Sequence, residues 1–417
     1  MELRRAVITG MGAVTPLGND LASFWNALLK GVSGAGPITR FDARKFKTQF
    51  ACEVKALDPT EHLEPREARK LDLFNVFAMV SADQAIRDSG LDLDRVNKDR
   101  VGVIWSTGIG GIKTFQEETS HFATGDGEPR FSPLFVTKMI ADMSSGLISI
   151  RYGFRGVNFV TVAACASSTN ALIDALNYVR LGKADLIVTG GCEAGVTEIG
   201  IGGFNAMRAL SVRNDSPQTA SRPFDVDRDG FVMGEGAGAL VVEELEHARR
   251  RGARIYAELA GGGLAADAYH VSASHPEGEG ALLGMKNALE DAGLSPRDVD
   301  YINAHATSTG VGDVSEIKAI DHLFNGSMDG VSISATKSMT GHLLGGAGAI
   351  EAIICALSIR DNVVPPTINT EKLDPIVPKK MHIVLREPEE RHVDVAISNT
   401  FGFGGHNAIA VLKRFSN

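Results

Sequence analysis

The chain has 417 residues, of which 44% are hydrophobic and 22% are charged, and its formal net charge is −9. Such a composition is typical of a globular protein with a large core, arranged as two domains or as one large duplicated domain, and it disfavours a disordered chain. The acidic charge disfavours a nucleic-acid binder, whose contact surface would be basic.

The N-terminal segment predicts neither a targeting signal nor a nucleotide site. Its short apolar run is broken by Gly10 and Gly12, which leaves too little for a signal peptide. The same glycines lack the third small residue of the dinucleotide-binding fingerprint, because Thr15 occupies that position. The four cysteines are scattered without a CxxC pair, so we expect no zinc site, no disulfide framework and a reducing, cytoplasmic environment.

Helix ends and strands then recur in two similar sets. Residues 85–91 (AIRDSGL) have the pattern of an amphipathic helix end closed by Gly90, and a strand is expected at residues 100–105. Residues 288–294 (ALEDAGL) nearly copy that helix end, and a strand is expected after them at residues 299–304. One such pair is common by chance, but further pairs follow.

Cys165 lies where an apolar run, residues 159–164, gives way to a helical stretch at residues 167–179. Free N–H groups and the positive end of a helix dipole favour a thiolate at such a junction, and they can lower a cysteine pKa from about 8.5 to roughly 3.5–7.5. The alternative is a small core residue, since free cysteine is often buried. We expect Cys165 to be a nucleophile with a lowered pKa.

Two histidines and a possible ion pair mark the second half of the chain. His305 directly follows an expected strand and His342 directly precedes a helix, and we interpret both positions as strand ends. A lone histidine is more often structural, but these two lie at duplicated positions beside small residues that leave room for a ligand. Residues 343–359 are apolar yet contain Glu351, so we expect a buried helix rather than a membrane span. A lone buried carboxylate is costly, so we expect Lys337 to pair with it.

Three matched pairs in the same order predict an internal duplication. Besides the helix ends, residues 161–176 and 338–353 share a strand, a polar residue (Cys165 or His342) and a small-residue helix, and residues 185–191 and 394–400 are both short apolar strands. Alternating strands and helices predict mixed or parallel sheets covered by helices on both sides. If a pseudo-two-fold axis relates halves that meet near residues 250–260, equivalent helix N-termini bring Cys165 and His342 face to face.

Residues 401–407 (FGFGGHN) follow the last of these strands. Their glycines allow the backbone to approach a ligand closely, and their phenylalanines can act as movable walls. The sequence has no Walker loop, no HExxH motif and no GxSxG motif, and a nicotinamide enzyme is a poor interpretation.

Six motifs spread over the chain are highly specific as a set. They are residues 162–168 (VAACASS), 220–225 (ASRPFD), 229–236 (DGFVMGEG), 305–309 (HATST), 337–342 (KSMTGH) and 399–405 (NTFGFGG). Together they resemble the β-ketoacyl-ACP synthase family, in particular its elongating type II members, within the thiolase superfamily. Ala306 stands where the family more often has glycine, and Ala163 and Ala164 precede the cysteine where Thr-Ala is commoner. Neither change removes a functional group.

The resemblance implies a thiolase-like α/β fold whose duplicated halves form a layered α-β-α-β-α sandwich. Residues 1–255 would be the N-terminal half with the nucleophilic cysteine, and residues 256–417 the C-terminal half with both histidines. The implied activity is an acyltransferase reaction, the decarboxylative Claisen condensation of malonyl-ACP with an acyl-enzyme thioester. It gives 3-oxoacyl-ACP and CO₂ in fatty-acid elongation, and no metal or other cofactor is implied.

The resemblance also assigns roles to particular residues. Cys165 would carry the acyl chain, and neutral imidazoles would stabilise the charge that develops on decarboxylation. Lys337, paired with Glu351, would keep His342 neutral. The implied catalytic residues are Cys165, His305, His342, Lys337, Glu351 and Phe403, the last as an oxyanion-binding N–H and a gate. The implied substrate-binding residues are Thr307 and Thr309 for the phosphopantetheine arm, and Phe401, Ile109, Phe204 and Phe135.

The implied partners are the acyl carrier protein and a second copy of the chain, with Phe135 reaching toward the partner subunit. Neither nucleic acid nor a membrane is an expected partner. The implied docking residues for the acidic carrier protein are Arg66, Arg69, Lys70, Arg130 and Arg208. One alternative is a ketosynthase of a polyketide or polyene pathway. Another, from a different class, is a non-catalytic chain-length partner subunit, but such partners lack the nucleophile, and a coenzyme A thiolase would carry a second cysteine in place of this histidine set.

Overall fold

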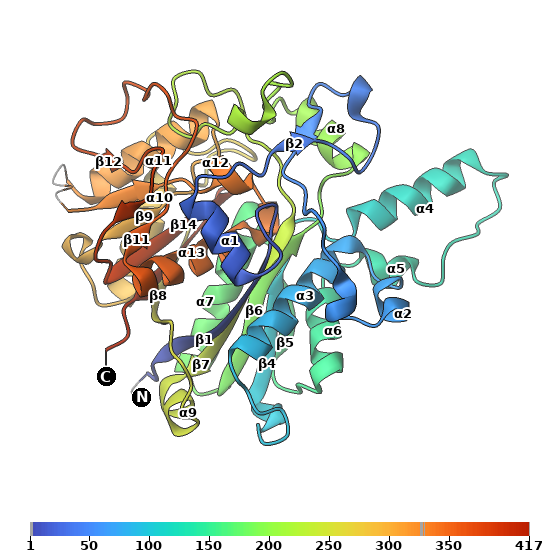
Figure 1. Ribbon diagram of the computed structural model, residues 1–417, viewed down its shortest axis with the longest axis horizontal. Coiled ribbons are helices and arrows are strands. Elements are labelled where there is room, and N and C mark those ends of the chain that lie inside the picture. Colours follow the sequence, from blue (N-terminus) through green and yellow to red (C-terminus); the bar gives the residue numbers. More distant parts are fainter. Residues whose placement is uncertain (1–2, 326–327, 329, 417) are drawn as a thin grey trace.

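The computed structural model describes residues 3–325, 328 and 330–416 as alternating strands and helices (Figure 1). Within that part of the chain eleven strands form one mixed sheet, in the spatial order β12-β10-β9-β14-β15-β8-β1-β7-β6-β4-β5. In chain order they are β1 (Ala6–Val14), β4 (Val101–Ser106), β5 (Asn158–Thr161), β6 (Leu186–Glu193), β7 (Gly236–Glu244), β8 (Ala257–Ala266), β9 (Tyr301–Asn303), β10 (Ser332–Ser334), β12 (His382–Ile383), β14 (Val395–Gly402) and β15 (His406–Lys413).

Two short two-stranded pairs and a set of α-helices complete the described structure. The paired strands are β2 (Gly36–Pro37) with β3 (Phe50–Ala51), and β11 (Val363–Val364) with β13 (Glu389–Glu390). The helices are α1 (Leu21–Leu29), α2 (Pro65–Ala68), α3 (Leu73–Asp88), α4 (Ile112–Thr124), α5 (Phe135–Met139), α6 (Met143–Tyr152), α7 (Ser167–Arg180), α8 (Glu198–Ala206), α9 (Leu245–Arg250), α10 (Glu279–Asp291), α11 (Gly310–Leu323), α12 (Lys337–Thr340) and α13 (Ala347–Asp361).

The same strand arrangement occurs twice in the sheet. The first half has the order β5-β4-β6-β7-β1 and the second half has the corresponding order β10-β9-β14-β15-β8. In each set the first three strands are parallel and the remaining neighbours are antiparallel. The sets join where Val7 and Ile8 of β1 pair with Glu258 and Ala257 of β8. The duplicated α/β architecture predicted from the sequence is therefore confirmed.

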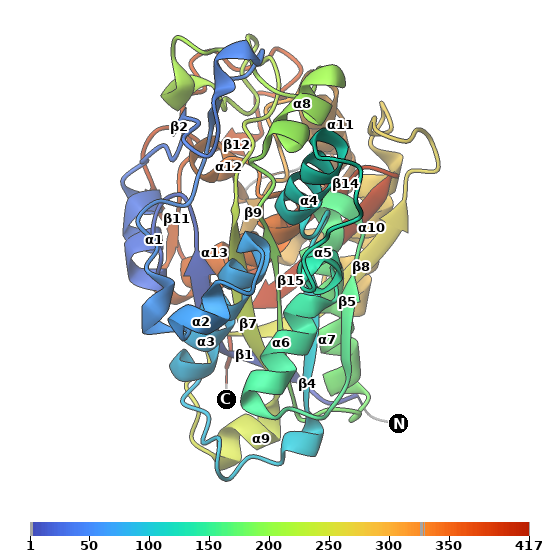
Figure 2. The same ribbon diagram turned by 90° about the vertical axis from the view of Figure 1, so that its right-hand side faces the viewer.

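Helices and sheet halves form five layers. Helices α7 and α13 lie between the two halves, and each contacts strands of both. On the outside, α3 and α6 cover the first half, and α10, with α11 packed against it, covers the second (Figure 1). In Figure 2 the helices α4, α5 and α6 lie on the side that faces the viewer. The order α-β-α-β-α agrees with the predicted layering.

The apolar segment 343–359 forms a buried helix, as predicted. Helix α13 is buried from Ala347 to Ile359, because sheet strands and α7 surround it. No helix among the described residues has both the length and the apolar character needed to cross a membrane. The strands predicted at residues 100–105, 185–191 and 394–400 are observed as β4, β6 and β14, with ends shifted by one or two residues.

The register of the duplication differs from the prediction at one place. Short 3₁₀ turns, Ala164–Ala166 and Leu344–Gly346, precede α7 and α13, and both begin with a left-handed residue, Ala164 at φ 49° and Leu344 at φ 47°. Gly345 therefore occupies the position equivalent to Cys165, and His342 lies three residues earlier. The prediction that His342 is the counterpart of the cysteine is wrong, because the small-residue pattern of the helix does not fix where its turn begins.

We predict that Gly348→Ala lowers the free energy of unfolding by about 1 to 3 kcal/mol, as overpacking does. A Cβ at Gly348 would overlap Thr169 Oγ1 of α7 and lie 3.1 Å from Thr400 Cγ2. Gly203→Ala in α8 is the matched control, since no atom lies within 4 Å of its new Cβ and alanine favours a helix by about 1 kcal/mol. Denaturant unfolding of both variants measures the effect, and a Gly348→Ala protein as stable as the wild type would contradict the close packing.

Candidate active site

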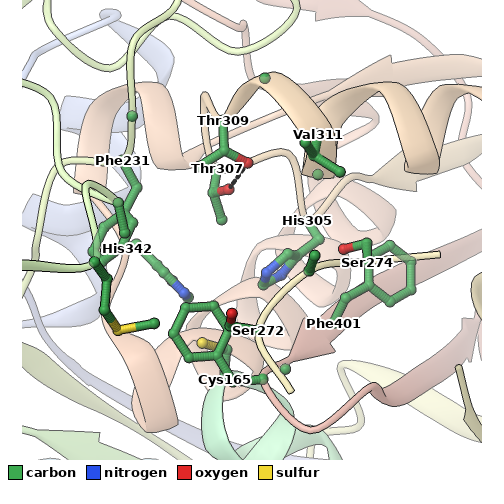
Figure 3. Close-up of a pocket in the computed structure, with 18 of the residues that line it drawn as sticks. Cys165, Phe231, Ser272, Ser274, His305, Thr307, Thr309, Val311, His342 and Phe401 are labelled. Atoms are coloured by element: carbon green, nitrogen blue, oxygen red, sulfur yellow. Dashed lines mark hydrogen bonds between the residues drawn. The ribbon is translucent and has the colours of Figure 1, made fainter. Parts of the chain in front are cut away.

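A cavity of about 430 Å³ lies between the two halves of the chain. Cys165 comes from the first half, whereas His305 and His342 come from the second, and all three line this cavity (Figure 3). The turns that precede α7 and α13 contact each other, which brings residues of distant sequence position together. The prediction that Cys165 and His342 share one pocket is confirmed.

Cys165 is presented by a tight turn between β5 and α7. Ala164 adopts a left-handed conformation that costs a residue with a Cβ free energy, and the Ser167 hydroxyl donates to its carbonyl at 2.6 Å. Cys165 is 9% exposed, and burial raises the pKa of its thiol to about 12, although the Lys337 ammonium and two backbone N–H groups oppose this. The expectation of a lowered pKa is therefore wrong, because desolvation outweighs the Lys337 charge and the two backbone N–H groups.

The glycine-rich loop closes over the cysteine turn. Residues 403–405 connect β14 to β15, and Gly404 and Gly405 have left-handed φ values of 87° and 74° that favour glycine. A Cβ at Gly402 would lie 2.6 Å from the Ala163 carbonyl oxygen, so this backbone lies directly on the turn. The backbone N–H groups of Phe403 and of Cys165 itself lie near the Cys165 sulfur and act to lower the pKa of its thiol.

His305 follows β9 and is held through its backbone. Its N–H donates to Glu316 Oε1 at 2.9 Å, and the Ala306 N–H donates to Glu316 Oε2 at 2.7 Å. Asn399 of β14 donates to the same carboxylate at 3.0 Å. Burial raises the pKa of Glu316 to about 7, and these donors oppose the shift. His305 is a strand-end residue, as predicted.

His342 lies in the turn between α12 and α13 rather than at a strand end, which corrects the sequence interpretation. Its N–H donates to the Val232 carbonyl at 2.8 Å, and its carbonyl accepts from the Gly234 N–H at 2.9 Å. The ring of Phe231 lies edge-on to the His342 ring, with centroids 5.4 Å apart (Figure 3). Both faces of the turn are therefore supported by the motif at residues 229–236.

The two imidazoles lie close together in a cavity that disfavours charge. Their centroids are 5.3 Å apart with the rings at 89°, and both Nδ1 atoms are buried without a hydrogen-bond partner. Burial, followed by the nearby Lys337 ammonium, lowers the pKa of both histidines well below 6.5. His342 further lowers the pKa of His305. Both rings are neutral at physiological pH.

Lys337 and Glu351 form the buried ion pair that the sequence predicts. Their side chains are 2% and 3% exposed, and the Lys337 ammonium contacts Glu351 Oε1. Neither residue lines the cavity. Burial raises the pKa of Glu351 to about 7, while the Lys337 charge opposes the shift. Both charged groups are therefore shielded from solvent.

Other residues singled out in the sequence divide into two groups. Thr307, Thr309, Phe401 and Phe204 line the cavity, and the hydroxyls of Thr307 and Thr309 are 3.1 Å apart (Figure 3). Ile109 and Phe135 do not line it, and Ile109 is 41% exposed on this single chain. Of the basic docking candidates, Arg208 lines the cavity, whereas four do not: Arg66, Arg69, Lys70 and Arg130. All five are exposed.

The sequence reasoning missed buried carboxylates that fix the site. Glu316 holds His305, and Glu193 at the end of β6 accepts from the Thr107 hydroxyl at 2.9 Å and from the N–H groups of Gly108 at 2.7 Å and Gly345 at 3.1 Å. Glu193 thus ties the turn after β4 to the turn before α13. Glu193 ends an otherwise mostly apolar run, residues 186–193, and a carboxylate in such a run is the sequence feature that could have predicted its role.

Family models fit this chain along most of its length. One described as "Beta-ketoacyl synthase, N-terminal domain" matches residues 3–248, and one described as "Beta-ketoacyl synthase, C-terminal domain" matches residues 256–371. The chain belongs to the β-ketoacyl synthase family.

Individual relatives indicate which members of the family the chain is similar to. The chain is 49% identical over 413 residues to 3-oxoacyl-[acyl-carrier-protein] synthase 2 of Staphylococcus aureus (strain COL), covering 99% of both proteins. The solved ishigamide ketosynthase/chain length factor superimposes with a TM-score of 0.92 at 33% identity, over 99% of this chain and 100% of that one. AntDE:AntF, a type II PKS acyl-carrier protein in complex with its ketosynthase, gives a TM-score of 0.91 at 31% identity, over 99% and 100% of the chains. These structures confirm the predicted thiolase-like fold.

We predict that the rings of His305 and His342 stay neutral between pH 6 and 8. A lowered pKa means that each ring gains its proton only at more acidic pH, so its signals should not move in this range. Nitrogen-15 NMR of labelled histidine rings checks this, with His305→Asn and His342→Asn for assignment and the urea-unfolded chain as the titrating reference. A midpoint at or above 6.5 for either ring would contradict the desolvated site.

Proposed function

We propose that this protein is a 3-oxoacyl-ACP synthase that condenses malonyl-ACP with an enzyme-bound acyl group in fatty-acid elongation. The observation that carries the proposal is the cavity in which a cysteine thiol faces two imidazoles that burial keeps neutral. Family membership and 49% identity to a 3-oxoacyl-ACP synthase 2 support the same reaction. The identity to the polyketide-type ketosynthase is lower, at 31%, which favours fatty-acid elongation over that alternative.

In the first half-reaction Cys165 Sγ attacks the thioester carbonyl of an acyl-ACP. The new Sγ–carbonyl bond forms, the bond to the carrier sulfur breaks, and the thiol proton passes to that leaving sulfur. The N–H groups of Cys165 and Phe403, which act to lower the pKa of the thiol, would stabilise the tetrahedral oxyanion. Removing one such donor costs other enzymes roughly 2.7 to 4 kcal/mol.

In the second half-reaction malonyl-ACP loses CO₂, and its electron pair becomes an enolate with negative charge on the thioester oxygen. The neutral imidazoles of His305 and His342 donate hydrogen bonds to that oxygen. Each ring can do so only if its N–H group is not already hydrogen-bonded to another acceptor. The enolate carbon then attacks the acyl carbonyl on Cys165. The carbon–sulfur bond breaks, and the sulfur takes up a proton from water to regenerate the thiol, so that each condensation consumes one proton from solution.

Surrounding residues prepare these steps. Lys337, with Glu351 as its counterion, keeps both imidazoles neutral through its charge. Thr307 and Thr309 offer hydroxyls to the phosphopantetheine arm as it enters the cavity. Phe403, on a hairpin with two left-handed glycines, gates access to Cys165. We propose Phe401, Phe204, Ile109 and Phe135 as acyl-chain contacts, with Phe135 reaching toward the partner subunit.

Acyl carrier protein is the proposed macromolecular partner. The AntDE:AntF structure contains a carrier protein in complex with its ketosynthase, and its ketosynthase shares this fold. Arg208, at the cavity wall, and the exposed basic residues at positions 66, 69, 70 and 130 would meet the acidic carrier. We further propose a cytoplasmic location, which four unpaired cysteines support, and a division of the chain into halves at residues 1–255 and 256–417.

The proposed assembly is a homodimer. Helices α4 and α5 extend from the body of the molecule (Figure 1), and they carry exposed apolar side chains: Phe115 and Phe122 on α4, and Val136 on α5. Strand β5 forms an edge of the sheet in the described part of the chain, and Val162 just after it is 60% exposed. Apolar side chains next to an open strand edge favour pairing with a second copy.

We predict that Cys165→Ala abolishes acyl transfer and condensation, because no other cysteine lines the cavity in the described part of the chain. His305→Ala should retain acylation of Cys165 but lose malonyl-ACP decarboxylation by roughly 10²- to 10³-fold, as other enzymes do when one oxyanion donor is removed. Intact-protein mass spectrometry with acyl-ACP measures the first half-reaction, and CO₂ release measures the second. A His305→Ala enzyme that elongates at the wild-type rate would contradict this assignment of roles.

We predict that the protein is a dimer in solution, because a monomer would expose the apolar α4–α5 face. Multi-angle light scattering should give about twice the chain mass of 44.3 kDa. Phe122→Asp, at a side chain that is 41% exposed here, should weaken the dimer, whereas Asp94→Asn on an exposed loop should not. A stable and active monomer would contradict the assembly.

A further inference from the structure

Three backbone segments from distant parts of the chain lie side by side behind His342. Met233 pairs with His342 on one side, and its neighbour Gly234 pairs with Cys52 on the other. The Cys52 N–H donates to the Met233 carbonyl at 2.8 Å, and the Glu235 N–H donates to the Cys52 carbonyl at 3.1 Å. The His342 backbone is therefore fixed by a middle segment, residues 232–235, that is itself fixed by residue 52.

An ion pair between a buried carboxylate and a partly exposed guanidinium, Arg40 at 32% exposure, fastens the end of this middle segment. The Glu235 carboxylate is 1% exposed, and its Oε1 accepts from the Val54 N–H at 3.0 Å and from Arg40 Nε at 3.1 Å. Arg40 Nη2 contacts the same carboxylate oxygen and also donates to the Val54 carbonyl at 3.2 Å. Arg40 and Glu235 thus hold residues 52–54 against residues 233–235.

This support reaches the His342 turn directly. A Cβ at Gly341, the residue before His342, would lie 2.8 Å from Cys52 Sγ, so the segment held by the ion pair packs on the turn itself. The Gly34 N–H donates to the Met339 carbonyl at 2.8 Å, which adds a second contact from the same N-terminal region. Arg40 and Glu235 do not line the active-site cavity. Any effect of the pair on the reaction must therefore pass through the segments that it holds, of which residues 232–234 contact the His342 backbone.

We propose that Arg40 and Glu235 are positioning residues for His342. The inference rests on the proposed condensation, in which His342 acts in decarboxylation and Cys165 acts in acyl transfer. The Cys165 turn is held by other contacts, with Ser167 and the glycine-rich loop. Loosening the ion pair lets the His342 turn shift, and it leaves the nucleophile in place. The two half-reactions then respond differently.

The test compares Arg40→Met with Arg40→Lys, which keeps the charge, and with Arg44→Met as the matched control. Arg44 pairs with Asp42 in the same region of chain, but the two side chains are 87% and 59% exposed. In Arg40→Met we expect the kcat of malonyl-ACP decarboxylation to fall about 10- to 100-fold, the range that a small misplacement of a catalytic group costs. The KM for malonyl-ACP and the rate of Cys165 acylation should stay within about twofold of wild type, because neither depends on the position of His342. Arg40→Lys should recover most of the loss, and Arg44→Met should change nothing.

A second readout does not depend on the reaction. The nitrogen-15 ring signals of His342 should shift or broaden in Arg40→Met, whereas those of His305, which Glu316 holds, should stay unchanged. If circular dichroism shows that Arg40→Met does not fold, Glu235→Gln, which keeps the side-chain shape, replaces it.

Three results for Arg40→Met would overturn the proposal. The first is an equal loss of both half-reactions that matches the fraction of unfolded protein. The other two are decarboxylation at the wild-type rate and unchanged His342 ring signals. If the wild type itself neither accepts acyl groups nor decarboxylates, the proposed function fails, and the ring signals alone decide the positioning role.

Discussion

The packing of α7 against α13 between the two halves of the sheet is the constraint on which the rest of the structure depends. Each helix contacts strands of both halves, and Gly348 lets α13 approach Thr169 of α7 closely. Close packing of this kind leaves few alternative arrangements of the two helices. Because the turns ahead of both helices meet, Cys165 and His342 reach one cavity although one comes from each half of the chain. The duplicated fold thus creates a site that neither half contains alone.

Burial sets the protonation states of that site. Desolvation keeps the thiol of Cys165 protonated and both imidazoles neutral, and the Lys337 charge reinforces the neutrality of the rings while it opposes the shift of the thiol. The charge of Lys337 is tolerated because Glu351 is buried beside it, and a buried charge without a partner would be strongly destabilising. A dry cavity with neutral hydrogen-bond donors suits a reaction whose negative charge arises only during decarboxylation. Because Cys165 is protonated in this cavity, its thiol proton must leave during acyl transfer.

Each reacting side chain sits on a short irregular turn, and each turn is held from elsewhere in the chain. Ala164 carries backbone strain beside the nucleophile, Glu316 collects the N–H groups around His305, and the segment 232–235 pairs with His342. Strained turns persist only where surrounding contacts overdetermine them. The extended sheet and buried helices supply that rigidity, and the buried carboxylates of Glu193 and Glu316 add hydrogen bonds to it.

The sequence by itself determined several of the strands and helices, the duplicated α/β architecture, the candidate nucleophile and histidines, and the burial of Glu351 with a cation. These features depend on periodicity and on residues a few positions apart, which a linear pattern retains. Only the tertiary structure decided that Cys165 has a raised pKa, that Gly345 and not His342 is its counterpart, and that Glu193, Glu316 and the Arg40–Glu235 pair fix the site. Desolvation depends on the whole tertiary environment, and Arg40 and Glu235 are 195 residues apart, so a local pattern gives neither the pKa shift nor the partner of each buried group.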